Sequence, residues 1–117
     1  MKKFASLVVL LMAVATLSAQ DIIGTWSGAL ETPQGELRIN FNVSETEDGY
    51  TATMDSPDQG AMGLPVSETK FESPELTIKA SAYNLEYVGK LVDKTNIHGT
   101  LTQHGQSLEL NLKKKTE

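Results

Sequence analysis

The sequence predicts an all-β fold: a single up-and-down antiparallel barrel of about eight short strands, preceded by a signal peptide. Two observations predict the barrel. Apolar and polar residues alternate from Ile22 onward, and turn-forming residues interrupt the pattern roughly every eight to twelve positions. A third observation, an apolar run behind Lys2 and Lys3, predicts the leader.

Residues 1–19 have the three parts of a secretory signal: the basic start, the apolar run at residues 7–17, and small residues before a cut after Ala19. The run has about eleven residues, whereas a membrane-spanning helix needs about twenty. A lipid anchor would need a cysteine at the cut, and the chain has no cysteine. We therefore expect residues 20–117 to form one barrel domain, periplasmic or secreted, without membrane insertion.

The chain has 117 residues and a formal net charge of −5, and it becomes more acidic when Lys2 and Lys3 leave with the signal. This charge argues against nucleic acid and against anionic membranes as partners. Without cysteines there are no disulfides, so the small domain must be stabilised by packing and by closure of its sheet.

The strands follow one another along the chain. Residues 37–44 give the cleanest alternation, with apolar side chains on one face and polar ones on the other. Short connections such as residues 47–49 and 104–105 predict hairpins, and consecutive hairpins give a meander. The alternation assigns to the core Trp26, Leu30, Leu37, Ile39, Phe41, Met54, Phe71, Ile78, Tyr87, Leu91, Ile97, Leu101, Leu108 and Leu110.

Three strands share one local pattern in which a glycine, Gly28, Gly89 or Gly99, falls on the inward face. Inward glycines bend strands around a barrel and make room for large neighbours such as Trp26 and Tyr87. They could also open a ligand cavity. Because large inward side chains dominate and the strands are short, we expect a mostly filled interior.

Gly24-Thr25-Trp26, on the first strand, resembles the opening of lipocalin-like proteins. A more extensive resemblance covers most of the chain: residues 23–28, 55–61, 63–66, 89–91 and 99–107 resemble a small β-barrel module that precedes the catalytic domain in secreted bacterial α/β-hydrolases. The resemblance implies a barrel fold and an accessory role. The hydrolase domain of those proteins has no counterpart in residues 20–117, so no catalytic residue is carried over.

The sequence contains no motif that predicts a catalytic or metal-binding site. There is no Gly-x-Ser-x-Gly elbow and no cysteine, and the two histidines, His98 and His104, are far from Ser56 in the sequence. On one extended strand His98 and His104 would lie roughly 20 Å apart, too far to share a metal ion. The acidic residues Glu45, Glu47 and Asp48 lack the ligand spacing of a calcium loop and indicate a hairpin turn instead. We expect no enzyme activity, no metal and no cofactor.

Residues 55–65 form the longest connection and carry the main candidate site. Their prolines, glycines and aspartates are typical of a purely structural turn, and equally of a lid or docking loop at the barrel mouth. Met62 is a flexible apolar residue suited to adaptable contacts. The candidate residues for binding a ligand or partner are Asp55, Ser56, Asp58, Gln59, Met62, Leu64 and Trp26.

Three functional hypotheses remain open. The first is a non-catalytic accessory or interaction module that docks on a secreted hydrolase or another envelope protein. The second is a lipocalin-like binder of a small apolar ligand, and the third is an envelope protease inhibitor. An enclosed apolar cavity above roughly 300 Å³, opening beside Met62, would favour the ligand binder.

Overall fold

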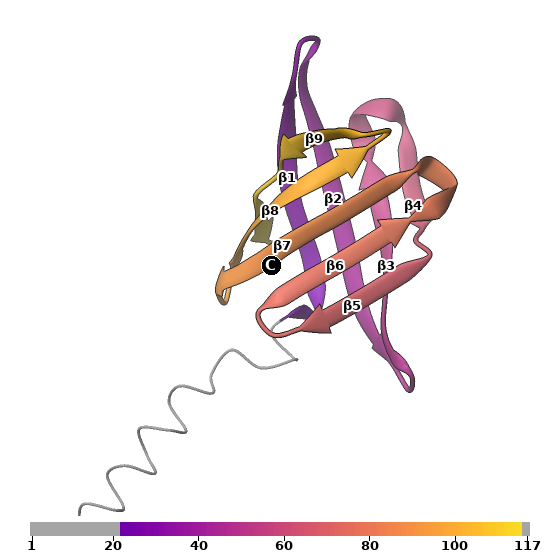
Figure 1. Ribbon diagram of the computed structural model, residues 1–117, viewed down its shortest axis with the longest axis vertical. Coiled ribbons are helices and arrows are strands. Elements are labelled where there is room, and N and C mark those ends of the chain that lie inside the picture. The colour runs from indigo at the N-terminus through magenta and orange to yellow at the C-terminus, as the bar shows by residue number, and fades with distance from the viewer. Residues whose placement is uncertain (1–21, 116–117) are drawn as a thin grey trace, which may run out of the picture.

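The computed structural model describes residues 22–115. In this part of the chain, the segments in which apolar and polar residues alternate form ten β-strands. They form one antiparallel sheet that curls into a half-barrel (Figure 1). The signal peptide predicted at residues 1–19 lies outside the described residues. The strands are β1 Gly24–Thr32, β2 Gly35–Thr46, β3 Gly49–Ser56, β4 Ala61–Pro65, β5 Glu68–Glu72, β6 Glu75–Ala80, β7 Leu85–Asp93, β8 Asn96–Gln103, β9 Gln106–Glu109 and β10 Leu112–Lys114.

The predicted all-β, antiparallel, barrel-like fold is confirmed, with two more strands than expected. One extra strand, β4, forms inside the connection at residues 55–65. The other arises because the last predicted strand breaks at Leu110 and Asn111 into β9 and β10. The described residues include two short 3-10 helices, η2 Pro57–Gln59 and η3 Ser81–Tyr83, and no helix in residues 22–115 is long and apolar enough to cross a bilayer.

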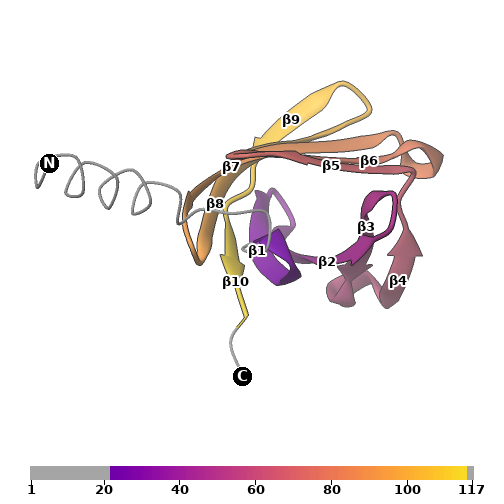
Figure 2. The same ribbon diagram turned by 90° about the horizontal axis from the view of Figure 1, so that it is seen from below.

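The sheet order is β4-β3-β2-β1-β10-β8-β7-β6-β5, so the chain departs from a pure meander near its end. Strand β10 lies between β1 and β8 and joins the two halves of the sheet, while β9 pairs with β8 alone and turns away from β1 (Figure 2). The predicted closure is therefore incomplete: β4 and β5 end the sheet without pairing with each other. Near this seam the rings of Tyr50 and Phe71 meet edge to face, with centroids 6.2 Å apart.

The centre of the core consists of Trp26, Phe41 and Tyr87, which we call the aromatic core. All three are fully buried, and the Phe41 and Tyr87 rings lie 5.3 Å apart. The indole of Trp26 donates a hydrogen bond of 2.9 Å to the carbonyl of Ile22. The hydroxyl of Tyr87 donates a hydrogen bond of 2.8 Å to the Leu110 carbonyl. The buried polar groups of Trp26 and Tyr87 are therefore both hydrogen-bonded.

Most of the predicted core is buried, and the exceptions have local causes. The prediction for Leu108 is wrong: its side chain is 42% exposed, because it lies on the four-residue strand β9, which pairs with β8 alone. Leu37 and Phe71, near the strand ends, are only partly buried. The predicted core omitted seven residues that are buried: Ile22, Val43, Ala52, Leu76, Ala80, Leu85 and Leu112.

Two of the three inward glycines make room for Tyr87. Gly89 and Gly99 face each other across β7 and β8, and the Tyr87 ring occupies the space above them. A Cβ atom at Gly99 would lie 2.5 Å from the Tyr87 hydroxyl, and one at Gly89 would lie 2.7 Å from it. The expectation that these glycines accommodate bulky neighbours is confirmed, because the space they leave is filled by the phenol ring.

Candidate functional site

The connection at residues 55–65 is more ordered than a loop, which corrects the sequence expectation. Strand β3 continues through Ser56, η2 forms a single turn, and β4 begins at Ala61 and pairs back on β3. Gly60 closes the turn in the left-handed region at φ 70°, where its N–H donates to the Pro57 carbonyl at 3.0 Å. We call residues 55–63 the Met62 turn.

A buried carboxylate anchors the Met62 turn. Asp55 is 7% exposed and accepts hydrogen bonds from the Gly63 N–H at 2.8 Å and the Asn42 side chain at 3.1 Å. Burial by itself would raise the pKa of Asp55, but hydrogen bonds from Gly63, Asn42 and Asn40 and the positive charge of Lys115 together lower it. Asp55 is therefore charged and joins β2 and β3 to the middle of β4 through Asn42 and Gly63.

An ion pair holds the outer side of the same turn against β2. The Arg38 guanidinium contacts Asp58 at 2.9 Å through Nη2 and 3.2 Å through Nε, and the Arg38 backbone N–H donates to the other carboxylate oxygen at 2.9 Å. These hydrogen bonds lower the pKa of Asp58. Asp58 thus positions the turn.

The predicted site residues divide between two faces of the molecule. Ser56, Gln59 and Leu64 line a pocket at the mouth of the barrel, together with Leu30, Leu37, Ile39, Met54, Tyr83, Leu85, Leu101 and Gln103. There the Ser56 hydroxyl donates to the Gln59 side-chain oxygen at 2.7 Å. The mouth pocket has a volume of about 150 Å³, against roughly 300 Å³ at the low end for small-molecule sites. The predicted filled interior agrees with this volume.

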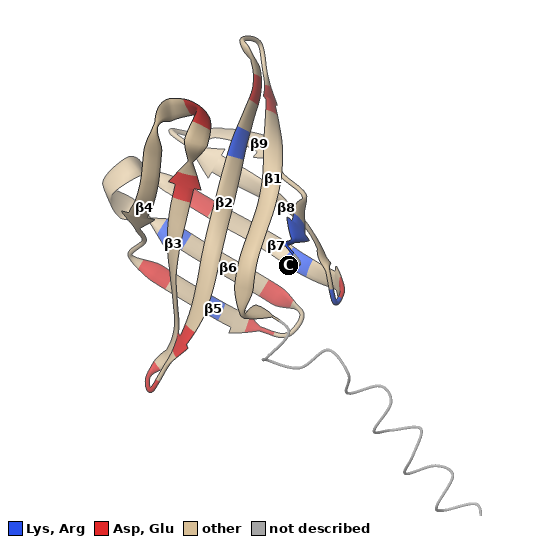
Figure 3. Ribbon diagram, turned by 180° about the vertical axis from the view of Figure 1, so that it is seen from behind, with Lys and Arg blue, Asp and Glu red and all other residues tan. Residues whose placement is uncertain are grey.

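Met62 lies on the outside. Its side chain is 63% exposed and borders an open groove of about 560 Å³ on the outer face of β1 and β2. Figure 3 views this face, with the Met62 turn on one side of β2 and β1 on the other. We call this feature the Met62 groove; it is lined by Ser27, Gly28, Ala29, Glu36, Arg38, Asn40, Pro57, Met62 and Lys115.

Hydrogen-bonded polar side chains form the floor of the Met62 groove and continue beyond it. Ser27 donates to Asn40 at 2.7 Å, and Thr25 donates to Asn42 at 2.9 Å one step along the same two strands. These pairs link β1 to β2, and Met62 beside them is a residue type suited to adaptable contacts. Sequence reasoning missed the floor. The signal that could have found it is the run of outward Asn and Ser side chains on two strands that pair as a hairpin.

Trp26 does not belong to this site. Its side chain is fully buried in the aromatic core, four residues down β1 from Leu30 at the mouth pocket, and it lines neither the mouth pocket nor the Met62 groove. The Lys114 ammonium lies 5.7 Å from the centre of its ring. Within residues 22–115 Trp26 therefore packs the core.

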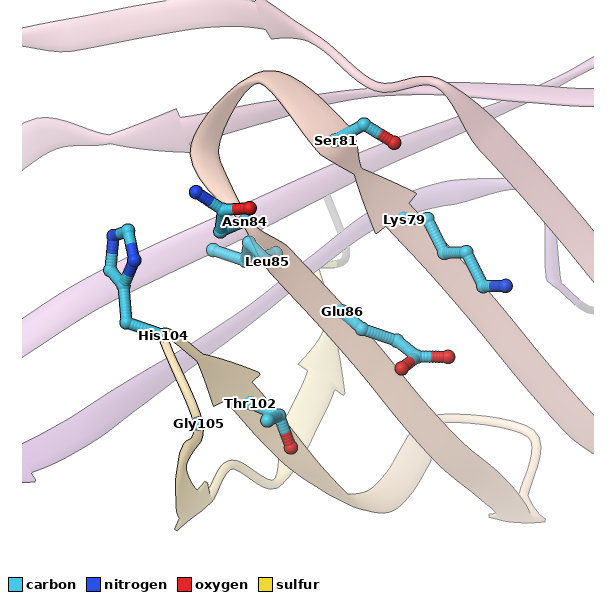
Figure 4. Close-up of a pocket in the computed structure, with 8 residues that line it drawn as sticks. All are labelled: Lys79, Ser81, Asn84, Leu85, Glu86, Thr102, His104 and Gly105. Carbon is cyan, nitrogen blue, oxygen red and sulfur yellow. The ribbon is translucent and has the colours of Figure 1, made fainter.

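A second surface depression lies on the opposite wall, between the β6–β7 and β8–β9 turns, with a volume of about 620 Å³ (Figure 4). Its lining is mostly polar and includes Lys79, Glu86 and Thr102. His104 sits at its rim beside Asn84 and donates a backbone hydrogen bond to the Asn84 carbonyl at 3.3 Å. Both residues have a φ of 52°, which is typical of tight turns.

The two histidines lie on separate parts of the surface. His98 and His104 are both exposed, and no group of three or more ligand-type side chains comes together in residues 22–115. Glu47 and Asp48 form the β2–β3 turn ahead of Gly49, whose φ is 137°, so the turn interpretation of this acidic cluster is confirmed.

Comparison with known proteins adds no identification: no protein-family model and no curated protein matches the chain. The antiparallel half-barrel is consistent with a barrel module.

Proposed function

We propose that the protein is a non-catalytic, exported interaction module, related to the barrel of secreted hydrolases, that docks on another protein through the Met62 groove. One observation carries the proposal: a large flexible apolar side chain, 63% exposed, stands on a braced turn beside a groove of about 560 Å³. Exposed apolar groups next to polar ones are typical of interaction sites.

The construction of the turn supports a binding role. Asp55 and the Arg38–Asp58 pair fix the backbone on either side of Met62, so little backbone entropy is lost when a partner binds. The thioether itself remains adaptable. The groove combines this apolar edge with Ser27 and Asn40, which offer hydrogen-bonding groups that a protein surface can match. A secreted hydrolase or another envelope protein is the expected partner class.

Binding of a small apolar ligand is the second candidate, and the mouth pocket is its only support in the described chain. Its apolar lining with Ser56 and Gln59 at the rim has the composition of a ligand site, but its volume of about 150 Å³ is about half the low end for small-molecule sites. Native mass spectrometry of the purified protein separates the two candidates, because a carrier would retain a small molecule.

Site-specific photo-crosslinking tests the docking proposal. A photoreactive amino acid at position 62 should capture a defined protein in the native envelope, and the same residue at position 104, exposed on the opposite wall, serves as the matched control. Export is tested in the same preparation, where the mature chain should begin at Gln20 or within a residue or two. Equal capture at both positions, or none at position 62, would overturn docking through the groove.

A further inference from the structure

The sulfur-containing side chains of the protein differ widely in exposure. The sequence has no cysteine and four methionines, of which Met1 and Met12 belong to the predicted signal peptide. The two methionines of residues 22–115 are Met54, which is 4% exposed in the core, and Met62, which is 63% exposed beside the Met62 groove. Within the described part of the chain, Met62 is therefore the one exposed sulfur-containing residue.

This difference in exposure decides which methionine a dissolved oxidant reaches. Hydrogen peroxide converts a thioether into a sulfoxide by transfer of an oxygen atom. A lone pair of the sulfur attacks the peroxide, the O–O bond breaks, an S–O bond forms and water leaves, so that sulfur is oxidised and the peroxide is reduced. Met62 can meet peroxide in the folded protein, whereas Met54 becomes accessible only when the structure opens.

We propose that Met62 is a redox-sensitive modification site, at which oxidation of the thioether to the sulfoxide by a peroxide releases the docked partner. The inference rests on the proposed function and adds the regulation of the same site. A sulfoxide is polar, so its burial against an apolar surface of the partner is unfavourable. Sulfoxide reductases reverse the change with thiols as reductant, which become a disulfide while the oxygen leaves as water.

The contacts that hold the Met62 turn allow this modification without unfolding. They are the hydrogen bonds of Asp55 to Gly63 and Asn42 and the pairing of Arg38 with Asp58. The thioether of Met62 takes no part in these contacts. An oxygen atom on its sulfur therefore changes the surface that a partner meets and leaves the turn in place.

Met54 shows the opposite situation and provides an internal control. It faces Phe41 in the β2–β3 ladder and belongs to the core. A sulfoxide at Met54 would place a polar group among apolar side chains and destabilise the whole domain. Oxidation of the two methionines should therefore be separable by rate and by its effect on the melting temperature.

The first experiment treats the purified protein with hydrogen peroxide and follows each methionine by peptide mass spectrometry, as a mass increase of about 16 Da. We expect Met62 to be oxidised at least about tenfold faster than Met54, with an unchanged melting temperature while Met62 alone is modified. Equal rates at the two positions would overturn the proposed site. So would a lower melting temperature at the stage where only Met62 carries the oxygen.

The second experiment measures docking with Met62 in place. A photoreactive amino acid at position 36, which is exposed and lines the same groove, leaves Met62 free to react. After peroxide is removed, the protein is mixed with a native envelope extract and illuminated. Selective oxidation of Met62 should lower the yield of the captured protein about tenfold, and treatment with a methionine sulfoxide reductase should restore it.

Two variants identify Met62 as the origin of the change. Met62→Leu keeps an apolar side chain without sulfur, so its capture yield should be the same before and after peroxide. Met62→Gln carries a polar side chain of similar length and should lower capture without any peroxide. A loss of capture that peroxide also causes in Met62→Leu would overturn the proposal, because the modified group would then lie elsewhere in the chain.

The outcomes distinguish this inference from the proposed function. If the unoxidised protein captures no defined protein from position 36, docking through the groove fails, and the redox inference fails with it. If it captures one and the yield is unchanged after selective oxidation of Met62, docking at the groove stands and the redox inference is overturned.

Discussion

The aromatic core and the Met62 turn are held by different kinds of interaction. Trp26, Phe41 and Tyr87 are fixed by apolar burial, with one hydrogen bond each for the indole and the hydroxyl. The Met62 turn buries little apolar surface and is held by Asp55 and by the Arg38–Asp58 pair. Burial in a packed core stabilises the whole fold, whereas polar braces on a surface turn set its local shape. Substitutions in the aromatic core should therefore lower the free energy of unfolding of the whole domain, whereas substitutions in the Met62 turn should have smaller, local effects.

The largest effect is expected in the aromatic core. Phe41→Ala should lower the free energy of unfolding by about 3 kcal/mol, because it removes a fully buried ring between Trp26 and Tyr87. Trp26→Ala should be comparable. Chemical denaturation measures both, with Leu108→Ala as the control, since that side chain is 42% exposed. A stability loss for Leu108→Ala as large as for Phe41→Ala would contradict the assigned faces of the sheet.

The second prediction concerns the space that Gly89 and Gly99 leave for the Tyr87 ring. Gly89→Ala should destabilise the protein by about 1–3 kcal/mol, because its Cβ would lie 2.6 Å from Ile97 and 2.7 Å from the Tyr87 hydroxyl. Tyr87→Phe removes that hydroxyl, so in a double-mutant cycle the two substitutions should cost less together than the sum of their separate costs. Additive costs would show that Tyr87 does not occupy this space.

The alternation of apolar residues was enough to predict the sheet and most of the core, because burial on one face of a strand imposes a period of two. It failed at Leu108 because the break at Leu110 and Asn111 moves β9 off the wall, and no local pattern marks where a strand leaves a sheet. The turn was predicted as a loop, since the contacts that order it join distant residues, such as Arg38 to Asp58 and Asn42 to Asp55. The groove was missed for the same reason: its floor comes from β1 and β2.

An intermediate effect is expected at Asp55, whose hydrogen bonds join the turn to the sheet. Asp55→Ala should cost about 1–2 kcal/mol, because the Gly63 N–H and the Asn42 amide lose their acceptor. The pKa of Asp55 is lowered in the folded state, so its contribution to stability is present above the unfolded pKa of about 3.9 and is lost as pH falls below that value. Denaturation of the parent and of Asp55→Asn between pH 6 and pH 2 should show a steeper acid loss for the parent. Parallel curves would contradict the charged brace.

The smallest effect on global stability, and the most local one, is expected at the Arg38–Asp58 pair. Both side chains are partly exposed, and an exposed ion pair contributes little to the free energy of unfolding. Arg38→Ala should therefore leave the melting temperature unchanged while speeding amide exchange in residues 57–62, where the turn loses its contact with β2. Asp58→Ala should speed exchange further, because it also removes the acceptor of the Arg38 backbone N–H, which Arg38→Ala retains.

The exchange rate of Arg38→Lys in residues 57–62 should fall between those of the parent and of Arg38→Ala, since lysine keeps the charge but cannot make the contact through both Nε and Nη2. A melting temperature for Arg38→Ala as low as that of Asp55→Ala would mean that the turn and the core unfold together, and that the Met62 turn is not a separate local unit.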